Sequence, residues 1–305
     1  MNKQLIFILQ SISQPRCIKR INSFISYGFD VEIYGFDRGK YNLNADNCEK
    51  NIQIIGKQKD GKEYMKKFFQ NQVAIRRLVK KHDPDKAIFY SFGFPLTLSL
   101  KLNKVTNYIY EISDIFYGYN KFNNVRWLFK AIDKYLIRNS LLTILTSEGF
   151  GNYLFGEKWP KNIIIQPNRV HSDFLNEQRP EIKQNDNTTQ HLIFSFIGAL
   201  RYPNTVFRFA KVIGERYPQH EFHFYGDSYL TNDVRKLSAT YRNVKYFGPY
   251  KNPDDLFRIY TNIDIVIACY DVQSLNERIA EPNKLYESLY FKKPIVVSKN
   301  TFLAK

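Results

Sequence analysis

The chain is poor in cysteine and histidine, the residues that build disulfide-bonded and metal-bound domains. Only three of its 305 residues are cysteines, and Cys17, Cys48 and Cys269 are far apart. An odd, scattered set argues against a disulfide framework and against a zinc site, and it fits a reducing cytoplasm. The five histidines also lack the spacing of metal ligands. The sequence therefore predicts no metal site.

Long apolar runs are missing as well. The first run, residues 5–9, has five consecutive apolar residues, which is too short for the core of a signal peptide. No run approaches the roughly 20 residues of a membrane-spanning helix. We expect a cytoplasmic protein whose membrane contact is peripheral, at the inner face of the plasma membrane.

Acidic residues are scarce relative to basic ones. The chain has 29 Asp and Glu against 45 Lys and Arg, a formal charge of +16. Such a charge suggests phosphates, anionic lipids or nucleic acid as neighbours. The predicted helix 63–82 lies in a segment, 62–86, with eight basic residues and three acids. A solvated face is the usual explanation, and a membrane-facing patch is the alternative. Without a basic-aromatic module, no nucleic-acid partner is expected.

Several common nucleotide and hydrolase motifs are also absent. No G-x-G-x-x-G follows the first predicted strand, where residues 10–14 read Gln-Ser-Ile-Ser-Gln. This disfavours dinucleotide binding. A P-loop, an H-E-x-x-H pair and a G-x-S-x-G elbow are likewise missing from the sequence.

What the sequence does contain is a regular alternation of short apolar strands with amphipathic helices. This α/β alternation predicts parallel sheets covered on both faces. It stops in the polar segment 172–190, which is predicted to be an interdomain linker, and then restarts. We therefore predict two Rossmann-like, doubly wound domains, residues 1–171 and 191–305, with the ligand in the cleft between them.

The most informative stretch is the helix predicted to begin after Pro282. It places Asn283, Lys284 and Glu287 in or near the first turn of the helix. Free N–H groups and the positive end of the helix dipole favour a phosphate there, and Glu287 offers acceptors for sugar hydroxyls. A capped surface helix with ordinary charges is the alternative.

Two further strand ends carry candidate residues. Gly198 and Arg201 follow a strand. Glycine there allows close approach of the backbone to a ligand, and the arginine guanidinium can bind a phosphate through two hydrogen bonds. A structural turn with a solvated arginine fits equally well. Glu111 and Asp114 end a strand of the first domain and are candidates to orient a hydroxyl or to act as a base. A helix-capping Asp is the slightly favoured alternative.

Taken in order, these pieces resemble the GT-B glycosyltransferases, in particular the GT4-like group (glycosyl transferases group 1). The most specific block is Pro-Asn-Lys-Leu-Tyr-Glu at 282–287, followed by Lys-Pro-Ile-Val-Val at 293–297. Looser strand-Gly segments lie at 194–201, 222–226 and 244–250, a helical segment lies at 255–260, and weaker landmarks lie at 144–148 and 166–168.

The resemblance implies a nucleotide-diphosphate sugar donor in the C-terminal domain and a glycan or lipid-linked acceptor on the N-terminal domain. By it, Glu287 would hold the donor ribose, while Arg201 and Lys284 would neutralise the diphosphate, with Gly198 and Asn283 beside them. Such enzymes need no metal or other cofactor and typically retain the anomeric configuration. The expected activity is a hexosyltransferase of surface polysaccharide biosynthesis.

Two features depart from the family pattern. The family pairs two glutamates separated by seven residues, but the position eight before Glu287 is Ile279. Glu277 and Glu281 are neighbours of that position. We take Glu281, with Asp114, as the candidate catalytic residues. The chain also ends at Lys305, soon after the last strand, so a shortened C-terminal domain is expected. The alternatives are a nucleotide-sugar 2-epimerase of the same fold and an inactive basic protein that binds glycan or membrane.

Overall fold

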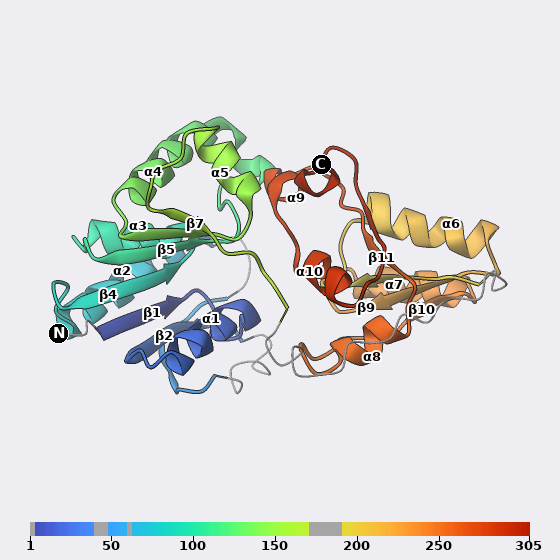
Figure 1. Cartoon of the computed structure of the whole chain (residues 1–305), viewed down its shortest axis with the longest axis horizontal. Coiled ribbons are helices and arrows are strands. Elements are labelled where there is room, and N and C mark those ends of the chain that lie inside the picture. Colours follow the sequence, from blue (N-terminus) through green and yellow to red (C-terminus); the bar gives the residue numbers. More distant parts are fainter. Residues whose placement is uncertain (1–3, 40–47, 60–62, 171–190) are drawn as a thin grey trace. The chain divides into compact units, whose positions relative to one another are not determined.

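The structure, a computed structural model, describes residues 4–39, 48–59, 63–170 and 191–305. The predicted linker at 172–190 lies outside these residues. The chain divides into two compact units. Unit 1 comprises Met1–Pro167 with Ser274–Ala280, and unit 2 comprises Asn168–Gln273 with Glu281–Lys305. Each unit is built on its own parallel sheet (Figure 1).

Unit 1 contains a seven-stranded sheet in the order β3-β2-β1-β4-β5-β6-β7. All neighbouring strands are parallel. The order reverses at β1 and β4, as the doubly wound prediction requires. The strands are β1 (Gln4–Leu9), β2 (Val31–Asp37), β3 (Ile52–Lys57), β4 (Ala87–Phe92), β5 (Tyr108–Ile112), β6 (Leu142–Leu145) and β7 (Ile163–Ile165).

Helices cover both faces of this sheet. On one face α1 packs Cys17 and Ile21 against Phe7 and Tyr90. The other face is covered by α2 to α5, whose inward leucines and isoleucines share a second core cluster. Right-handed crossovers account for this division, because the chain reverses its direction across the sheet after β3. The helices are α1 (Pro15–Ser26), α2 (Tyr64–Lys81), α3 (Phe94–Leu102), α4 (Arg126–Arg138) and α5 (Glu148–Phe155).

A short helix late in the chain, α9 (Leu275–Ile279), belongs to unit 1. Ser274 caps it, and the Asn276 side chain accepts a hydrogen bond from Ile115 N (2.8 Å) and donates one to Ile115 O (3.0 Å). The Ser147 hydroxyl donates to Ile279 O at 2.7 Å. The sequence alone assigns all of 191–305 to the second domain. These long-range bonds instead place residues 274–280 with the first.

Unit 2 contains a five-stranded parallel sheet in the order β10-β9-β8-β11-β12. Its strands are β8 (Ile193–Ile197), β9 (Glu221–Tyr225), β10 (Val244–Tyr246), β11 (Ile265–Ala268) and β12 (Ile295–Val297). Its helices are α6 (Arg208–Arg216), α7 (Thr231–Thr240), α8 (Leu256–Thr261) and α10 (Asn283–Tyr290). Two separate parallel α/β sheets agree with the predicted fold class.

Helix α8 starts at Leu256, within the helical segment expected at 255–260. Asp255 Oδ2 accepts a hydrogen bond from Lys251 N at 2.8 Å, which holds residues 251–255 in a turn. From this turn the Asn252 side chain directs its amide nitrogen toward Glu287.

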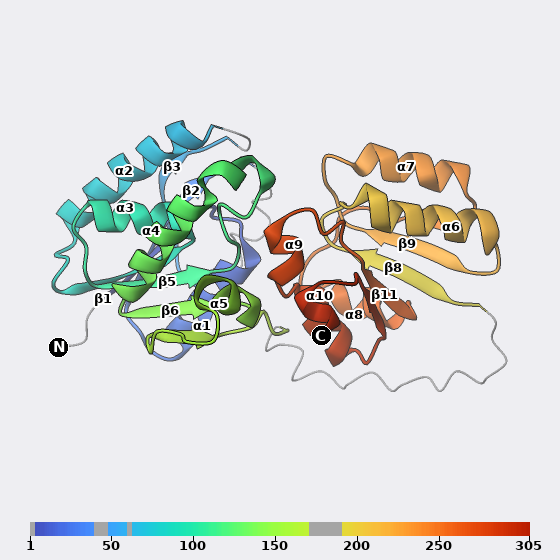
Figure 2. The same cartoon turned by 90° about the horizontal axis from the view of Figure 1, so that it is seen from above.

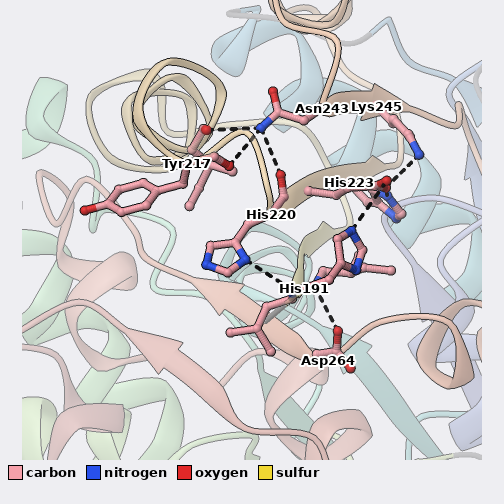
Figure 3. Close-up of polar contacts among 11 residues, drawn as sticks. His191, Tyr217, His220, His223, Asn243, Lys245 and Asp264 are labelled. Carbon is pink, nitrogen blue, oxygen red and sulfur yellow. Dashed lines mark hydrogen bonds and ion pairs between the residues drawn. The ribbon is translucent and has the colours of Figure 1, made fainter. Parts of the chain in front are cut away.

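A polar network ties together the amino ends of the unit 2 strands (Figure 3). Glu221 pairs with Lys245 Nζ at 2.7 Å and with His223 Nε2 at 2.5 Å. Asn243 Nδ2 donates to three main-chain carbonyls, one of them that of His220. The His223 side chain and the His220 carbonyl thus belong to the structural hydrogen bonding of this sheet.

Candidate functional site

Glycine turns follow three neighbouring strands at the carboxyl edge of the unit 2 sheet. Gly198, Gly226 and Gly248 all have positive φ angles, of 128°, 133° and 84°. A Cβ atom added to Gly226 would lie 1.9 Å from Gly198 O, so this close approach of two main chains requires glycine. Because the turns carry no side chains here, they leave room beyond the strand ends.

A cavity of about 270 Å³ lies at this edge. Residues from β8 and its following loop, from the loops after β10 and β11, and from α10 line it. The five predicted donor-binding residues, Gly198, Arg201, Asn283, Lys284 and Glu287, all belong to this lining. The fold thus brings together residues that are up to 89 positions apart in the chain (287 − 198).

Lys284 is a strongly perturbed charge of the cavity. Its side chain lies on the first turn of α10 and is only 8% exposed. The ammonium Nζ lies 3.6 Å from the ring centroid of Phe196 and 5.6 Å from that of Tyr270. The pKa of Lys284 is lowered to about 7, chiefly by burial; Glu287 and Cys269 oppose this shift, and Arg201 adds to it. An arriving anion would favour the charged form of this amine.

Glu287 lies one helical turn after Lys284 and is also buried, at 6% exposure. Its Oε2 accepts a hydrogen bond from the Tyr260 hydroxyl at 2.7 Å, and Asn252 Nδ2 lies 3.5 Å from its Oε1. Burial, followed by the charge of Glu287, raises the pKa of Tyr250 and that of Tyr260. Both tyrosines therefore stay protonated and can act as hydrogen-bond donors.

Arg201 and Asn283 are exposed residues of the lining. Asn283 is the first residue of α10, directly after Pro282, so the free N–H groups of the first turn lie beside it. Lys284 and Glu287 are three residues apart and share one face of the helix. The lining therefore combines two cations, a helix start and a fixed carboxylate.

Sequence reasoning missed the aromatic and amide part of the lining. The lining also includes Phe196, Tyr250, Asn252 and Tyr270. Tyr260 lies outside the lining and positions Glu287 through its hydroxyl hydrogen bond. The chain has 22 tyrosines, so nothing in the sequence singles out these three. Tyr270 also lines a larger neighbouring cavity of about 490 Å³, whose other walls are mostly apolar.

The predicted catalytic residues do not line the cavity that contains Lys284 and Glu287. Glu281 lies just ahead of α10, and its Oε2 accepts a hydrogen bond from the Tyr286 hydroxyl. Asp114 is an exposed residue of unit 1, after β5, and its charge helps to raise the pKa of Arg16. Their catalytic roles stay predictions.

The neighbouring candidate, Glu111, is a structural residue. Its side chain is fully buried and pairs with Arg20 Nε at 3.1 Å and with Arg16 Nε at 3.7 Å. The Tyr90 hydroxyl donates to Glu111 Oε2. The expectation that Glu111 orients a substrate hydroxyl is therefore wrong, because its carboxylate is enclosed by residues of α1 and β4.

Within the described ranges, no three His, Cys, Asp or Glu side chains are grouped so that they could hold a metal ion. In the same residues, no helix has both the length and the apolarity needed to cross a bilayer.

Comparison with solved structures identifies the architecture. The chain superposes on HepE of Anabaena in complex with UDP and glucose with a TM-score of 0.71, at 13% identity, over 99% of this chain and 82% of that chain. It superposes on the lipopolysaccharide outer core galactosyltransferase WaaB with a TM-score of 0.62, at 13% identity, over 98% and 81%. The chain has the GT-B fold. The prediction of this fold from the sequence is confirmed.

The same GT-B architecture occurs in a protein described as a UDP-N-acetylglucosamine 2-epimerase from Listeria monocytogenes. That match has a TM-score of 0.59, at 11% identity, over 97% of this chain and 79% of that chain. Neither a protein-family model nor the sequence of a curated protein matches the chain. The likeness to known proteins is therefore one of fold.

Proposed function

We propose that the chain is a glycosyltransferase that takes a sugar from a nucleotide-diphosphate sugar. One observation carries the proposal: the unit 2 cavity holds a buried carboxylate, Glu287, beside the buried amine of Lys284 and the guanidinium of Arg201. Glu287 accepts hydrogen bonds from the donor ribose. Lys284, Arg201 and the first N–H groups of α10 hold the diphosphate. The GT-B neighbours with bound UDP and glucose support this choice of ligand.

The cationic part of the cavity suits the chemistry of transfer. The bond from the sugar anomeric carbon to the phosphate oxygen breaks, and its electron pair leaves with the nucleoside diphosphate. Negative charge therefore grows on the phosphate oxygen in the transition state, where Lys284 and Arg201 stabilise it. An acceptor hydroxyl forms the new bond to the anomeric carbon and releases its proton to a base.

The finer features of the reaction belong to the same proposal. The acceptor is a glycan or a lipid-linked sugar held by unit 1, where Asp114 serves as the base, and Glu281 assists at the donor. The transferred group is a hexose, the anomeric configuration is retained, and neither a metal nor another cofactor takes part. We place the enzyme in the GT4-like group and in surface polysaccharide synthesis on the cytoplasmic side of the membrane.

Equilibrium binding tests the proposal directly. The full chain is titrated calorimetrically with UDP, GDP and their glucose, galactose, N-acetylglucosamine and mannose derivatives. We expect one of these donors to bind, and to bind more weakly to the Lys284→Met and Arg201→Gln variants. Lys211→Gln removes an exposed charge from α6 and serves as the matched control. A well-folded chain that binds none of these nucleotides would contradict the proposal.

A 2-epimerase is the second candidate, because an epimerase shares the fold. Incubation of the bound donor without any acceptor separates the two. An epimerase converts or hydrolyses the donor by itself, whereas a glycosyltransferase needs an acceptor for full turnover. Donor binding with no turnover under either condition would instead identify an inactive binding protein.

A further inference from the structure

The outward face of α2 in unit 1 combines apolar and basic residues. Met65, Phe69 and Val73 lie at successive turns of the helix and are 67%, 60% and 53% exposed. Exposed cations alternate with them on the same face: Arg76, Arg77 and Lys80, with Lys66, whose Nζ pairs with Glu63 Oε2 at 3.6 Å. Residues 64–82 contain no acid. A helix that only needs solvent on its outer side has no reason to expose three large apolar side chains there.

The outward face of α4 has the same character. Trp127 is 71% exposed, and Leu128 and Tyr135 are exposed on the same side. The one acid of the helix, Asp133, points inward, where it accepts hydrogen bonds from the hydroxyls of Tyr110 (2.8 Å) and Tyr117 (2.9 Å). The basic residues of the helix, by contrast, lie toward its surface or at its flanks: Arg126, Lys130, Lys134 and Arg138.

These two helices belong to one layer. Both contact α3, and the three helices lie side by side on the same face of the unit 1 sheet (Figure 2). At its end α3 adds exposed Leu102, and Lys101 Nζ lies 5.5 Å from the ring centroid of Tyr135. We call this layer surface the α2–α4 face. It consists of Met65, Phe69, Val73, Leu102, Trp127, Leu128 and Tyr135 with the cations of α2, α3 and α4.

We propose that the α2–α4 face docks on the surface of a bilayer that contains anionic lipids. The positive charges of this face complement the negative surface of such a bilayer. The apolar side chains between them can enter the boundary between headgroups and acyl chains, where Trp and Tyr are especially favoured. Exposed apolar side chains that gather on one face among polar residues mark an interaction site. Nucleic acid fits less well, because aliphatic Met65, Val73 and Leu128 offer it neither stacking nor hydrogen bonds.

The electrostatic part of the proposal is tested by vesicle co-sedimentation of the full chain. We expect binding to phosphatidylcholine vesicles with roughly 30% phosphatidylglycerol, weakening as salt rises from about 0.1 M to about 1 M and the Debye length falls from about 10 to about 3 Å. Arg77→Gln with Lys80→Gln should weaken binding about 30-fold, given the usual contribution of a cation near an anionic surface. The matched control, Lys211→Gln with Lys236→Gln, removes the same charge from α6 and α7 and should leave binding unchanged.

The apolar part is tested by fluorescence. The chain has two tryptophans, so Trp159→Phe leaves Trp127 as the only indole. Its emission should shift to the blue on anionic vesicles. Trp127→Ala should weaken vesicle binding at least threefold, whereas Tyr229→Ala, which removes an aromatic ring that is 85% exposed in unit 2, should not. Thermal unfolding of each variant verifies that it is folded.

Three results would overturn the proposal. They are equal binding to neutral and anionic vesicles, unchanged binding in both α2–α4 variants, and displacement of the chain from vesicles by single-stranded DNA at the same face. The measurements use no donor and no acceptor, so they stand whether or not the proposed transferase activity is found.

Discussion

Binding of a nucleotide-diphosphate sugar should draw a proton onto Lys284. Burial lowers the pKa of this amine to about 7, so the empty cavity holds a mixture of neutral and charged lysine near neutral pH. A diphosphate beside Nζ favours the charged form strongly. Binding and protonation are therefore linked, and the proton count measures how closely the phosphates approach this side chain.

The magnitude follows from the pKa of about 7. The neutral fraction of Lys284 is about 0.9 at pH 8, about 0.5 at pH 7 and about 0.1 at pH 6. If the bound diphosphate raises the pKa by about two units or more, proton uptake per ligand approaches those same fractions. Charging the amine costs about 1.4 kcal/mol more at pH 8 than at pH 6, or about tenfold in affinity. Affinity thus rises as pH falls through 7 and then levels off.

The assay is calorimetric titration with the donor sugar in buffers of different ionisation enthalpy. A nucleotide-diphosphate sugar is the right ligand because its diphosphate carries no terminal group that titrates in this range. The Lys284→Arg variant keeps a permanent charge and should bind without proton uptake. The reasoning is refuted if the wild-type chain binds donor at pH 8 with no proton uptake, or if the arginine variant takes up as many protons as the wild type.

Three further predictions concern the same unit. Glu287→Gln should weaken donor binding by about 1.5–3 kcal/mol, because ribose hydroxyls lose a charged acceptor, and equal calorimetric affinities would contradict the role of Glu287. Gly226→Ala should lower the free energy of unfolding in urea by roughly 3 kcal/mol or more, since its Cβ would lie 1.9 Å from a main-chain oxygen at positive φ. Gly28→Ala, with nothing within 4 Å, is the control and should cost clearly less. The pKa of His223 is lowered by burial, and that of Glu221 is lowered because hydrogen bonds from Lys245 and His223 outweigh burial. Unit 2 should therefore lose stability as pH falls below about 6.5 and again below about 4.5. The lower step should be smaller in melting curves of Glu221→Gln, since Asp255 and Glu215, whose pKa values are also lowered, remain.

The fold was predictable because its signals are local. Strands such as β1 and β6 are short, largely apolar runs, and α2 shows a clear 3.6-residue period. The helix α9 has only five residues, and its place in unit 1 depends on bonds between Asn276 and Ile115, which are 161 positions apart. A contact between residues so far apart in the chain cannot be predicted from hydrophobic periodicity.

The candidate site was predictable only where its residues follow strand ends or begin a helix. Gly198, Lys284 and Glu287 satisfy that rule, and the fold brings them to one cavity. Tyr250 and Tyr260 do not, because their relation to Glu287 depends on how the loop after β10 and helix α8 return to α10. Burial, which lowers the pKa of Lys284, is equally invisible before the chain is folded.

The membership of α9 in unit 1 has a consequence for recombination of this gene. Residues 274–280 are encoded inside the stretch that makes unit 2, so the units meet at three junctions along the chain, near 168, 274 and 281. A single crossover near residue 170 would pair the first unit with a foreign α9. The main chain at Ile115 and the Ser147 hydroxyl would then face side chains that did not evolve with them. Chimaeras that keep 274–280 with residues 1–167 should fold better than chimaeras cut once.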